Sequence, residues 1–251
     1  MQPRKGHAAD AYGRNVQRWL AIVGRKGGSG KTALALGLAA HYARAGRRVL
    51  LVDLDPQGSG TLALGADAGG EALAALLAGT GETVPYVTIS EAPPVALVPG
   101  GPALEAVTAP RPLRDVLGGV PADVVLVDCP PGHADLDRLA LQAADVVLAA
   151  CEAHRLGIAG AARVLDETKG LRPRPRCALV LSRVDDRRGL DRAAPDLLAG
   201  AFALPVLTIH QDAALALALN AGGLPPASGR AAADLEAVAA WIDKQTERGT
   251  P

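Results

Sequence analysis

The sequence has few aromatic side chains: Phe, Trp and Tyr together make up 2% of its 251 residues. Hydrophobic residues nevertheless account for 49% of the chain, so a core has to be built mainly from Ala, Val and Leu. A chain of this length and apolar content can bury a sizeable core, and undivided α/β domains often reach this size. We therefore expect one α/β domain.

Cysteine is scarce as well. The three cysteines are odd in number and none belongs to a C-x-x-C pair, which argues against a disulfide framework and against a zinc site. No apolar run approaches the length of a membrane span, and the first eighteen residues lack the apolar segment of a signal peptide. These absences predict a soluble protein of the reducing cytoplasm.

The chain has no excess of either charge, because 26 basic residues balance 26 acidic ones. The balance hides an uneven distribution. Residues 1–50 carry ten Lys and Arg against one acid, residues 51–150 carry three against thirteen, and residues 151–251 carry thirteen against twelve. The zero net charge therefore says nothing about local patches.

Apolar runs and helical patterns alternate along the chain. The alternation predicts a mostly parallel, twisted β-sheet of about seven to eight strands with helices on both faces. We expect a flexible basic extension at residues 1–18 and one domain over residues 19–251. The runs that have the continuous apolar character of buried strands lie at 20–23, 48–53, 95–99, 123–128, 145–150, 177–182 and 204–209, and helical patterns lie at 31–46, 102–118, 157–170 and 230–246.

The stretch GRKGGSGKT, residues 24–32, follows the first strand-like run and opens the first helix. A strand, a glycine-rich turn and a helix N-terminus together form an anion site, because free backbone amides and the helix dipole converge there. The stretch fits a phosphate-binding loop except that Arg25 stands where G-x-x-x-x-G-K-[ST] has its first glycine, and Lys26 follows. In such a loop Lys31 binds the β- and γ-phosphates and Thr32 binds Mg²⁺.

Two further motifs place acidic side chains at strand ends. In VLLVDLDPQGSG, residues 49–60, Asp53 ends the strand and Asp55 follows two residues later, so both carboxylates can lie at one rim of the sheet. In DVVLVDCPPGH, residues 123–133, Asp128 ends another strand, as the aspartate of a Walker B element does, and would hold Mg²⁺. Each motif is common by itself, and their order along the chain makes them informative.

Together the three motifs resemble those of the ParA/MinD family of deviant Walker P-loop ATPases. KGGSGKT matches the family's K-G-G-x-G-K-T, VLLVDLDPQGS its D-x-D-P-Q segment, and VLVDCPPG its D-x-P-P segment. The D-x-D-P-Q segment favours the ParA branch, and the resemblance continues over nearly the whole chain from about residue 19 onward. It implies a P-loop fold that binds ATP and Mg²⁺ and hydrolyses ATP to ADP and phosphate.

The resemblance also implies roles for individual residues. Lys26 matches the family's signature lysine, which reaches across an ATP-bound homodimer to the phosphates of the partner's nucleotide and neutralises charge there, as an arginine finger does. Lys31 is the second catalytic lysine, and Asp55 orients the attacking water. The expected ATP-binding residues are Lys26, Gly27, Gly28, Ser29, Gly30, Lys31, Thr32 and Ala33, and the expected metal-site residues are Thr32, Asp53 and Asp128.

The chain departs from the family pattern at three places. Ala33 stands where many members have a Thr or Ser that touches the α-phosphate, so one hydroxyl contact is missing. Cys129 replaces the commoner Thr of D-T-P-P, and we expect it to be a small buried hydrophobe. His210 occupies a place often held by Pro or Arg, and we expect a structural or surface histidine there.

Three classes of function are compatible with these motifs. The first is a ParA-like ATPase, cytoplasmic and nucleoid-associated, that partitions plasmid or chromosome DNA and is stimulated by a ParB-like centromere-binding or cargo adaptor protein. The alternative is an ATPase that positions a protein cargo or cycles on the membrane as MinD does, but the C-terminal AVAAWIDKQTERGTP lacks the basic amphipathic character of a membrane anchor, so no membrane partner is expected. A metabolic P-loop enzyme is the third. An iron–sulfur carrier would need paired cysteines, and an amide ligase does not need Lys26.

The ParA interpretation predicts that the ATP-bound dimer binds double-stranded DNA without sequence preference. Between residues 155 and 192 the chain has ten basic residues against five acidic ones. KGLRPRPR precedes a strand and RVDDRRGLDR follows it, so the two basic clusters leave opposite ends of that strand. For any single residue, a solvated cation at a helix end is the alternative, but phosphate contacts add up and a dimer doubles them. The leading candidates are Arg187 and Arg188, followed by Arg172, Arg174 and Arg176.

Overall fold

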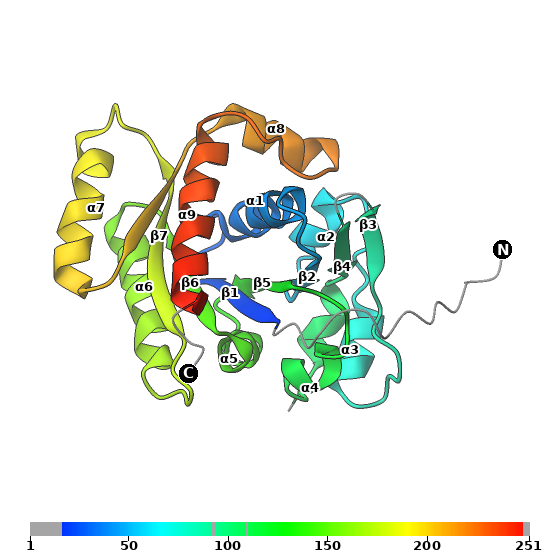
Figure 1. Ribbon diagram of the computed structural model, residues 1–251. Coiled ribbons are helices and arrows are strands. Elements are labelled where there is room, and N and C mark those ends of the chain that lie inside the picture. Colours follow the sequence, from blue (N-terminus) through cyan, green and yellow to red (C-terminus); the bar gives the residue numbers. More distant parts are fainter. Residues whose placement is uncertain (1–16, 92–93, 109, 248–251) are drawn as a thin grey trace.

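The computed structural model describes residues 17–91, 94–108 and 110–247 (Figure 1). These residues form one eight-stranded sheet in the order β3-β4-β2-β5-β1-β6-β7-β8. All neighbouring strands run parallel except β3, which pairs antiparallel with β4 at one edge. The strands are β1 (Arg18–Gly24), β2 (Val49–Asp53), β3 (Val87–Glu91), β4 (Pro94–Val98), β5 (Val124–Pro131), β6 (Val146–Cys151), β7 (Arg176–Val184) and β8 (Val206–His210).

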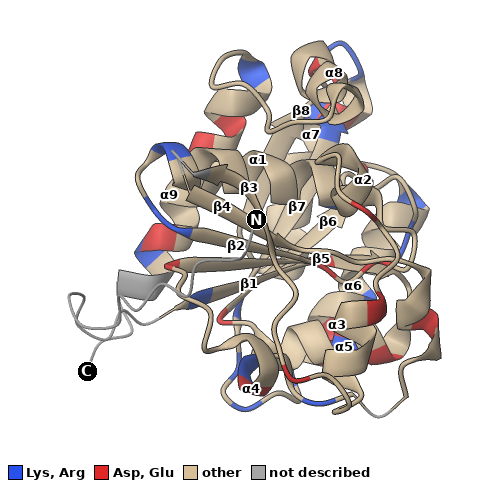
Figure 2. Ribbon diagram, turned by 90° about the vertical axis from the view of Figure 1, so that its right-hand side faces the viewer, with Lys and Arg blue, Asp and Glu red and all other residues tan. Residues whose placement is uncertain are grey.

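Helices cover both faces of the sheet, and Figure 2 shows the sheet between the two helical layers. One layer contains α1, α2, α8 and α9, and the other contains α3, α4, α5 and α6 (Figure 1). The helices are α1 (Lys31–Arg44), α2 (Ser59–Ala63), α3 (Glu71–Leu77), α4 (Leu113–Leu117), α5 (Ala134–Ala143), α6 (Arg155–Thr168), α7 (Gly189–Phe202), α8 (Ala213–Ala221) and α9 (Arg230–Glu247), with a 3₁₀ turn, η1, at Pro102–Ala106.

The central strands are buried along their whole length, as continuous apolar runs predict. Every residue of β2 and β6 is buried, and so are the last six residues of β1. A strand covered by helices on both faces places alternate side chains in two separate cores, which is why each run is apolar throughout rather than alternating. The expected mostly parallel sheet with helices on both faces is confirmed.

The seven predicted strands are all present, but two parts of the prediction were incomplete or wrong. Strand β3 was missed because VTISE is short and alternates apolar with polar residues, as an edge strand does. The helix predicted over 102–118 is wrong: the chain forms η1 and the short α4 instead. Pro110 and Pro112 lie between them and cannot continue an α-helix.

Residues 1–16 of the predicted basic extension lie outside the described residues. Strand β1 begins at Arg18, one residue before the predicted domain start, and the division of the chain at this point stays a prediction. Within the described part of the chain, no helix is both long enough and apolar enough to cross a membrane.

Helix α9 packs against α1 and β8. Its Leu235, Val238, Ala239 and Ile242 are buried in the same core as most of the apolar side chains of α1. The two helices approach closely because α1 has glycine at position 37, where an added Cβ would lie 2.5 Å from Cδ1 of Leu235.

We expect Leu235→Ala to lower the free energy of unfolding by about 2–5 kcal/mol, because it opens a cavity between α1 and α9. Leu217→Ala in α8 is the matched control, since that leucine is 68% exposed. Urea unfolding followed by circular dichroism measures both. Equal losses in the two variants would show that α9 contributes little to the packing of α1.

Candidate functional site

The site lies at the edge of the sheet where the central parallel strands end. Strand β1 leads through residues 25–30 into α1, and the last residue of β2, Asp53, stands opposite Asp128 of β5 in the register of the two strands. The three sequence motifs, which are far apart along the chain, are therefore brought together at one edge. This is the edge where ligands bind in open α/β sheets.

Glycines give the loop between β1 and α1 its conformation. Gly28 and Gly30 have φ of +77° and +81°, in the left-handed region that side chains disfavour. A Cβ on Gly30 would also lie 2.9 Å from Cβ of Ser182, and one on Gly24 would lie 2.6 Å from the carbonyl oxygen of Ala150. The loop is thus fitted closely between the ends of β6 and β7.

Ser182 of β7 holds the loop through a hydrogen bond, and the sequence did not predict this role. Its hydroxyl lies 2.7 Å from the carbonyl oxygen of Ser29 and 3.2 Å from that of Cys151, and can donate to either. The only signal in the sequence was a single serine in an apolar strand. A buried hydroxyl needs a partner, and here the partner is the phosphate loop itself.

The backbone amides of the loop, residues 26–30, are left without hydrogen-bond acceptors among the described residues. Lys31 is 5% exposed, and its Nζ lies 3.3 Å from the carbonyl oxygen of Lys26. A buried ammonium group beside free amides at the N-terminus of α1 is a site for an anion.

Asp128 is the carboxylate that fits a metal ion. Both of its oxygens are buried without a hydrogen-bond partner among the described residues. Burial raises the pKa of Asp128 to about 8, and the nearby charge of Asp53 adds to the rise. The Thr32 hydroxyl, which is near Asp128 but outside hydrogen-bond geometry, and the charge of Lys31 lower it. An oxygen pair left bare in this way is suited to Mg²⁺, which prefers carboxylate ligands and retains water.

Asp53 has a different environment. Its Oδ2 accepts hydrogen bonds from the amide and the hydroxyl of Thr61, both at 2.8 Å, and its Oδ1 accepts one from the amide of Asp55 at 3.1 Å. Asp53 therefore fixes the start of α2 over the site. A Cβ on Gly60 would lie 3.2 Å from Oδ2 of Asp53 and 3.5 Å from Oδ2 of Asp128, so the first turn of α2 closes over both carboxylates.

Asp55 forms the turn that follows β2 and is 7% exposed. Its Oδ1 accepts from the amide of Gln57 at 2.9 Å, and its carbonyl oxygen accepts from the amide of Gly58 at 2.8 Å. The structure thus places Asp55 at the same edge of the sheet as Asp53 and Asp128.

Lys26 lies on the outer side of the loop, away from the buried Lys31. Its side chain is 55% exposed, and its Nζ lies 3.6 Å from Oε2 of Glu152 and 3.3 Å from Nε2 of His154. Glu152 also pairs with Arg183 at 3.3 Å, and His154 caps α6 by accepting from the amide of Gly157. These partners at the end of β6 were missed, because nothing in CEAHRLG marks a glutamate as a partner for a lysine 126 positions earlier.

A cavity of about 830 Å³ opens beside the loop, with Gly30 and Ala33 on one wall. Its other walls come from β7, from the turn between β7 and α7, and from the segment between β8 and α8. This volume lies in the range of small-molecule pockets. Its position beside the anion site suits the nucleoside part of a nucleotide.

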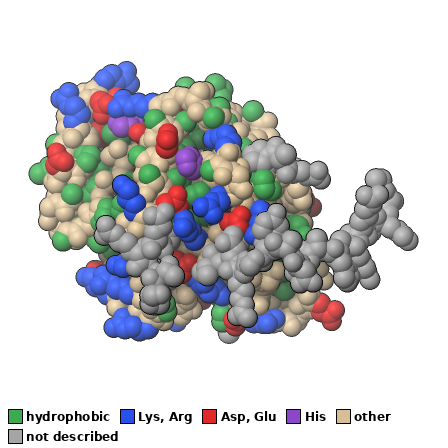
Figure 3. Space-filling model, in the orientation of Figure 1, with side chains coloured by type: hydrophobic (Ala, Val, Ile, Leu, Met, Phe, Trp, Pro, Cys, Tyr) green, Lys and Arg blue, Asp and Glu red, His purple; other side chains and the backbone are tan. Residues whose placement is uncertain are grey.

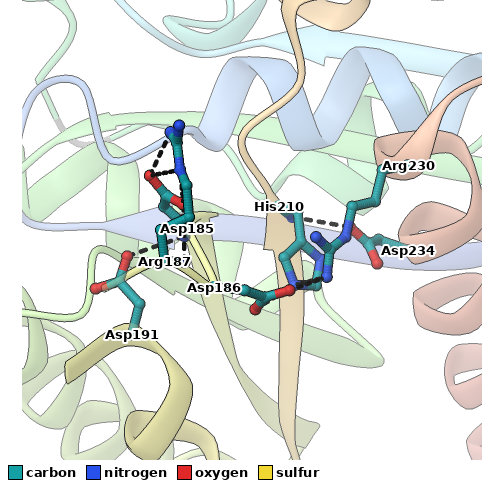
Figure 4. Close-up of polar contacts among 7 residues, drawn as sticks. All are labelled: Asp185, Asp186, Arg187, Asp191, His210, Arg230 and Asp234. Atoms are coloured by element: carbon teal, nitrogen blue, oxygen red, sulfur yellow. Dashed lines mark hydrogen bonds and ion pairs between the residues drawn. The ribbon is translucent and has the colours of Figure 1, made fainter. Parts of the chain in front are cut away.

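His210 joins three elements at the rim of this cavity (Figure 4). Its backbone amide and its Nδ1 bond Oδ2 of Asp234 in α9, at 2.8 Å and 2.9 Å. Its Nε2 lies 2.8 Å from a guanidinium nitrogen of Arg230 and 3.3 Å from Oδ1 of Asp186. With the ring hydrogen on Nδ1, Nε2 accepts from Arg230, and the histidine holds β8 to α9 and to the turn after β7.

The five candidate DNA-binding arginines lie at the two ends of β7. Arg187 and Arg188 stand at the edge that bears the phosphate loop, and Arg172, Arg174 and Arg176 stand at the opposite edge, as expected from the sequence. In Figure 3 basic side chains gather over the turn between α6 and β7 and over the turn between β7 and α7. The two groups do not form one continuous patch in this view.

Arg187 is 88% exposed but already paired. It donates to both carboxylate oxygens of Asp185, and these bonds hold the pKa of Asp185 well below its ordinary value (Figure 4). Arg188 lies 3.9 Å from the same carboxylate and also lines the cavity. The five arginines remain candidates for DNA binding.

The three cysteines are buried, and burial raises the pKa of the Cys129 thiol well above its ordinary value. Cys129 is thus a core side chain, as expected. Within the described residues, no cluster of three or more His, Cys, Asp and Glu side chains could hold a metal ion by itself. A bound Mg²⁺ would accordingly need ligands from a phosphate and from water besides Asp128.

The first strand of this parallel sheet leads through a glycine-rich anion loop into a helix, and Asp53 and Asp128 face each other on two neighbouring strands. These features define a P-loop nucleotide hydrolase. Comparison with known proteins gives the family. Residues 17–179 match a family described as an AAA domain. The chain is 39% identical over 185 residues to the chromosome-partitioning ATPase Soj of Thermus thermophilus. The aligned region covers 69% of this chain and 72% of that protein. The chain belongs to the ParA/MinD family of deviant Walker P-loop ATPases.

Solved structures agree with this fold. The cobyrinic acid a,c-diamide synthase of Mycobacterium smegmatis, with a bound ATP analogue and magnesium, superposes with a TM-score of 0.76 at 25% identity, over 94% of this chain and 97% of that one. The septum site-determining protein MinD of Pyrococcus horikoshii, in complex with Mg-ADP, gives a TM-score of 0.77 at 23% identity, over 92% and 97% of the two chains. One fold thus serves several activities, and the site has to decide between them.

We expect Asp128→Asn to stabilise the nucleotide-free protein at high pH. Because the pKa of Asp128 is raised to about 8, the folded chain binds a proton there that the unfolded chain releases near pH ~4, so folding stability falls as the pH rises between these values. Asparagine removes this penalty. Urea unfolding with EDTA should therefore give a higher midpoint for the variant at pH 8.5 and a much smaller difference in the same direction at pH 5.

The control for this experiment is Asp135→Asn, which removes the same charge from an exposed position in α5. It should leave both midpoints close to those of the wild type. If Asp128→Asn were less stable than the wild type at pH 8.5, the carboxylate would have a partner in the folded protein, and its assignment as a bare metal ligand would be wrong.

Proposed function

We propose that this chain is a ParA-like ATPase that dimerises on ATP, binds DNA without sequence preference and hydrolyses ATP when a ParB-like partner stimulates it, thereby driving the segregation of plasmid or chromosome DNA. The observation that carries the proposal is that two lysines of one loop occupy different environments. Lys31 is buried within the loop, and Lys26 is exposed outside it. The likeness to the chromosome-partitioning ATPase Soj supports the same assignment.

The loop and its helix bind the nucleotide. The amides of residues 26–30 and the ammonium group of Lys31 hold the phosphates, and the cavity beside Ala33 takes the nucleoside. The hydroxyl of Thr32 and the bare carboxylate of Asp128 hold Mg²⁺. When bound, the metal withdraws charge from the phosphates and so makes the terminal phosphorus easier to attack.

Two acidic side chains and Lys26 have separate roles in hydrolysis. Asp53 keeps the first turn of α2 closed over the metal side of the site. Asp55 orients the attacking water by accepting a hydrogen bond from it. The nearly buried position of Asp55 keeps other water away. Lys26 of one subunit neutralises charge on the phosphates held by the other, so that turnover requires the dimer.

Helix α9 does not support the alternative of a membrane-cycling ATPase. The apolar side chains of α9 that are buried, from Leu235 to Ile242, face α1 and the sheet. An interfacial helix has to offer its apolar face to lipid. As far as Glu247 the described part of the chain uses this face for its own core.

Duplex binding controlled by nucleotide tests the proposed function. With ATP and Mg²⁺ the protein should retard DNA duplexes of unrelated sequence, and with ADP it should not. Affinity should fall steeply as salt rises, because phosphate contacts release counterions. Lys31→Ala should lose the response by losing ATP, whereas Asp55→Ala should bind ATP, hold the dimer and stay on DNA for longer.

The arginine candidates can be separated in the same assay. Substitution of Arg187 and Arg188 by Ala should weaken binding to all sequences alike and flatten the salt dependence, with a smaller effect from Arg172, Arg174 and Arg176. ATP affinity should be unchanged in both variants. An ATP-bound dimer that ignores DNA at low salt would refute the partitioning assignment and point to a protein cargo.

Lys26→Gln should impair dimerisation and hydrolysis together while the ATP affinity of the monomer stays within about threefold, since the lysine acts on the partner's nucleotide. Lys244→Gln, an exposed change of the same charge on α9, is the control. Light scattering with ATP and a phosphate-release assay measure the two effects. A variant that turned over ATP as the wild type does would make Lys26 an ordinary surface lysine.

A further inference from the structure

Arg25 stands at the loop position where the common P-loop has glycine, and its side chain turns away from the phosphate face. One guanidinium nitrogen lies 3.0 Å from Oδ2 of Asp137 in α5. Another bonds Glu167 in α6. The residue beside Lys26 is thereby tied to two helices that belong to other parts of the chain.

The surroundings of Arg25 leave room for this arrangement. Residue 160 of α6 is glycine, and a Cβ there would lie 3.1 Å from Cβ of Arg25. The backbone of Arg25 also approaches the turn that follows Asp128, because a Cβ on Gly132 would lie 3.6 Å from the carbonyl oxygen of Arg25. Helix α5 begins directly after that turn. One residue therefore touches both the turn and the helix that continue the Asp128 strand.

Asp137 is buried with an exposed fraction of 0%, and its Oδ1 has no hydrogen-bond partner among the described residues. Burial raises the pKa of Asp137 to about 7, and the charges of Glu167 and Asp55 raise it further, while Arg25 and Lys31 act in the opposite direction. These are the charged groups that face the carboxylate from the loop, α1, α6 and the turn after β2. Burial thus favours the protonated carboxyl group, Arg25 favours the carboxylate, and the two forms are about equally populated near pH 7.

We propose that Arg25 is a positioning residue: its ion pair with Asp137 anchors the phosphate loop to the helix after the Asp128 strand and sets the direction in which Lys26 projects. The inference deepens the proposed function, on which it rests for the role of Lys26. When Asp137 is ionised, a charge-assisted bond holds the guanidinium; when it is protonated, a weaker bond remains and the loop loses its anchor. Turnover then depends on the ionisation of a residue that touches neither ATP nor metal.

The test compares Asp137→Asn with the wild type across pH. Asparagine keeps the shape of the side chain and mimics the protonated state, so its turnover of ATP should be about fivefold to tenfold below that of the wild type at pH 8 and should approach it at pH 6, where about a tenth of Asp137 is ionised. ATP's terminal phosphate titrates in a similar range. It does so equally in both proteins, and the ratio of the two turnover rates is the readout.

Arg25→Lys gives a second, independent variant. Lysine keeps the positive charge beside Asp137 but has one nitrogen and cannot bridge Asp137 and Glu167 as the guanidinium does. Its turnover should fall about as far as that of Asp137→Asn, while its dissociation constant for ATP stays within about threefold of the wild type, because Lys31 and the loop amides are intact. Asp135→Asn, exposed on the same helix, should keep the wild-type turnover and pH profile.

A measurement on the nucleotide-free protein separates this inference from the proposed function. The backbone amide signals of residues 25–28 in ¹H–¹⁵N NMR spectra should titrate near pH ~7 in the wild type and in Asp135→Asn. The part of that titration that belongs to Asp137 should be missing in Asp137→Asn. If the wild type bound ATP without hydrolysing it and these signals still titrated, the proposed function would fail and the anchor would stand. Identical titrations or identical turnover profiles in the wild type and Asp137→Asn would overturn the inference.

Discussion

The register between β2 and β5 is the constraint on which the site depends. It places Asp53 directly opposite Asp128 at the last paired position between the two strands. Two ionised carboxylates at facing positions of neighbouring strands repel each other, and the fold accommodates them by giving them different surroundings. Asp53 is satisfied by Thr61 and by the backbone of the following turn, whereas Asp128 is left without a partner. A shift of one residue would turn one of them into the opposite core and leave no place for a metal ion.

Most of the fold could be predicted from the sequence because a parallel sheet between two helical layers leaves a strong local signal. Strands such as β6 are apolar at every position, and the glycine-rich loop has few other uses. The errors fell where local patterns and tertiary context disagree. Strand β3 lies at the edge and looks like a polar loop, and the region between η1 and α4 has helical residues interrupted by prolines.

The contacts that surround the loop could not be predicted, because each joins residues that are distant in sequence. Ser182 supports Ser29 across 153 positions, and Arg25 reaches Asp137 across 112. Motifs predict side chains for contact with a nucleotide, since phosphates and metals demand particular residue types. Residues that hold the loop in place are under no such demand, and many combinations of partners can serve. The motif residues could accordingly be proposed from the sequence, and their supports could not.

The position of α9 has a consequence for how the protein is made. Helix α1, which carries Lys31 and Thr32, has α9 packed against it, and α9 is the last helix of the described chain. Strand β1 likewise needs β5 and β6, which lie more than a hundred residues later, as its neighbours. Contacts of such long sequence separation form slowly. A nascent chain emerging from the ribosome thus has its nucleotide loop early but completes the layer behind it only after α9 has been made, so ATP is expected to bind after that point and to assist none of the earlier stages.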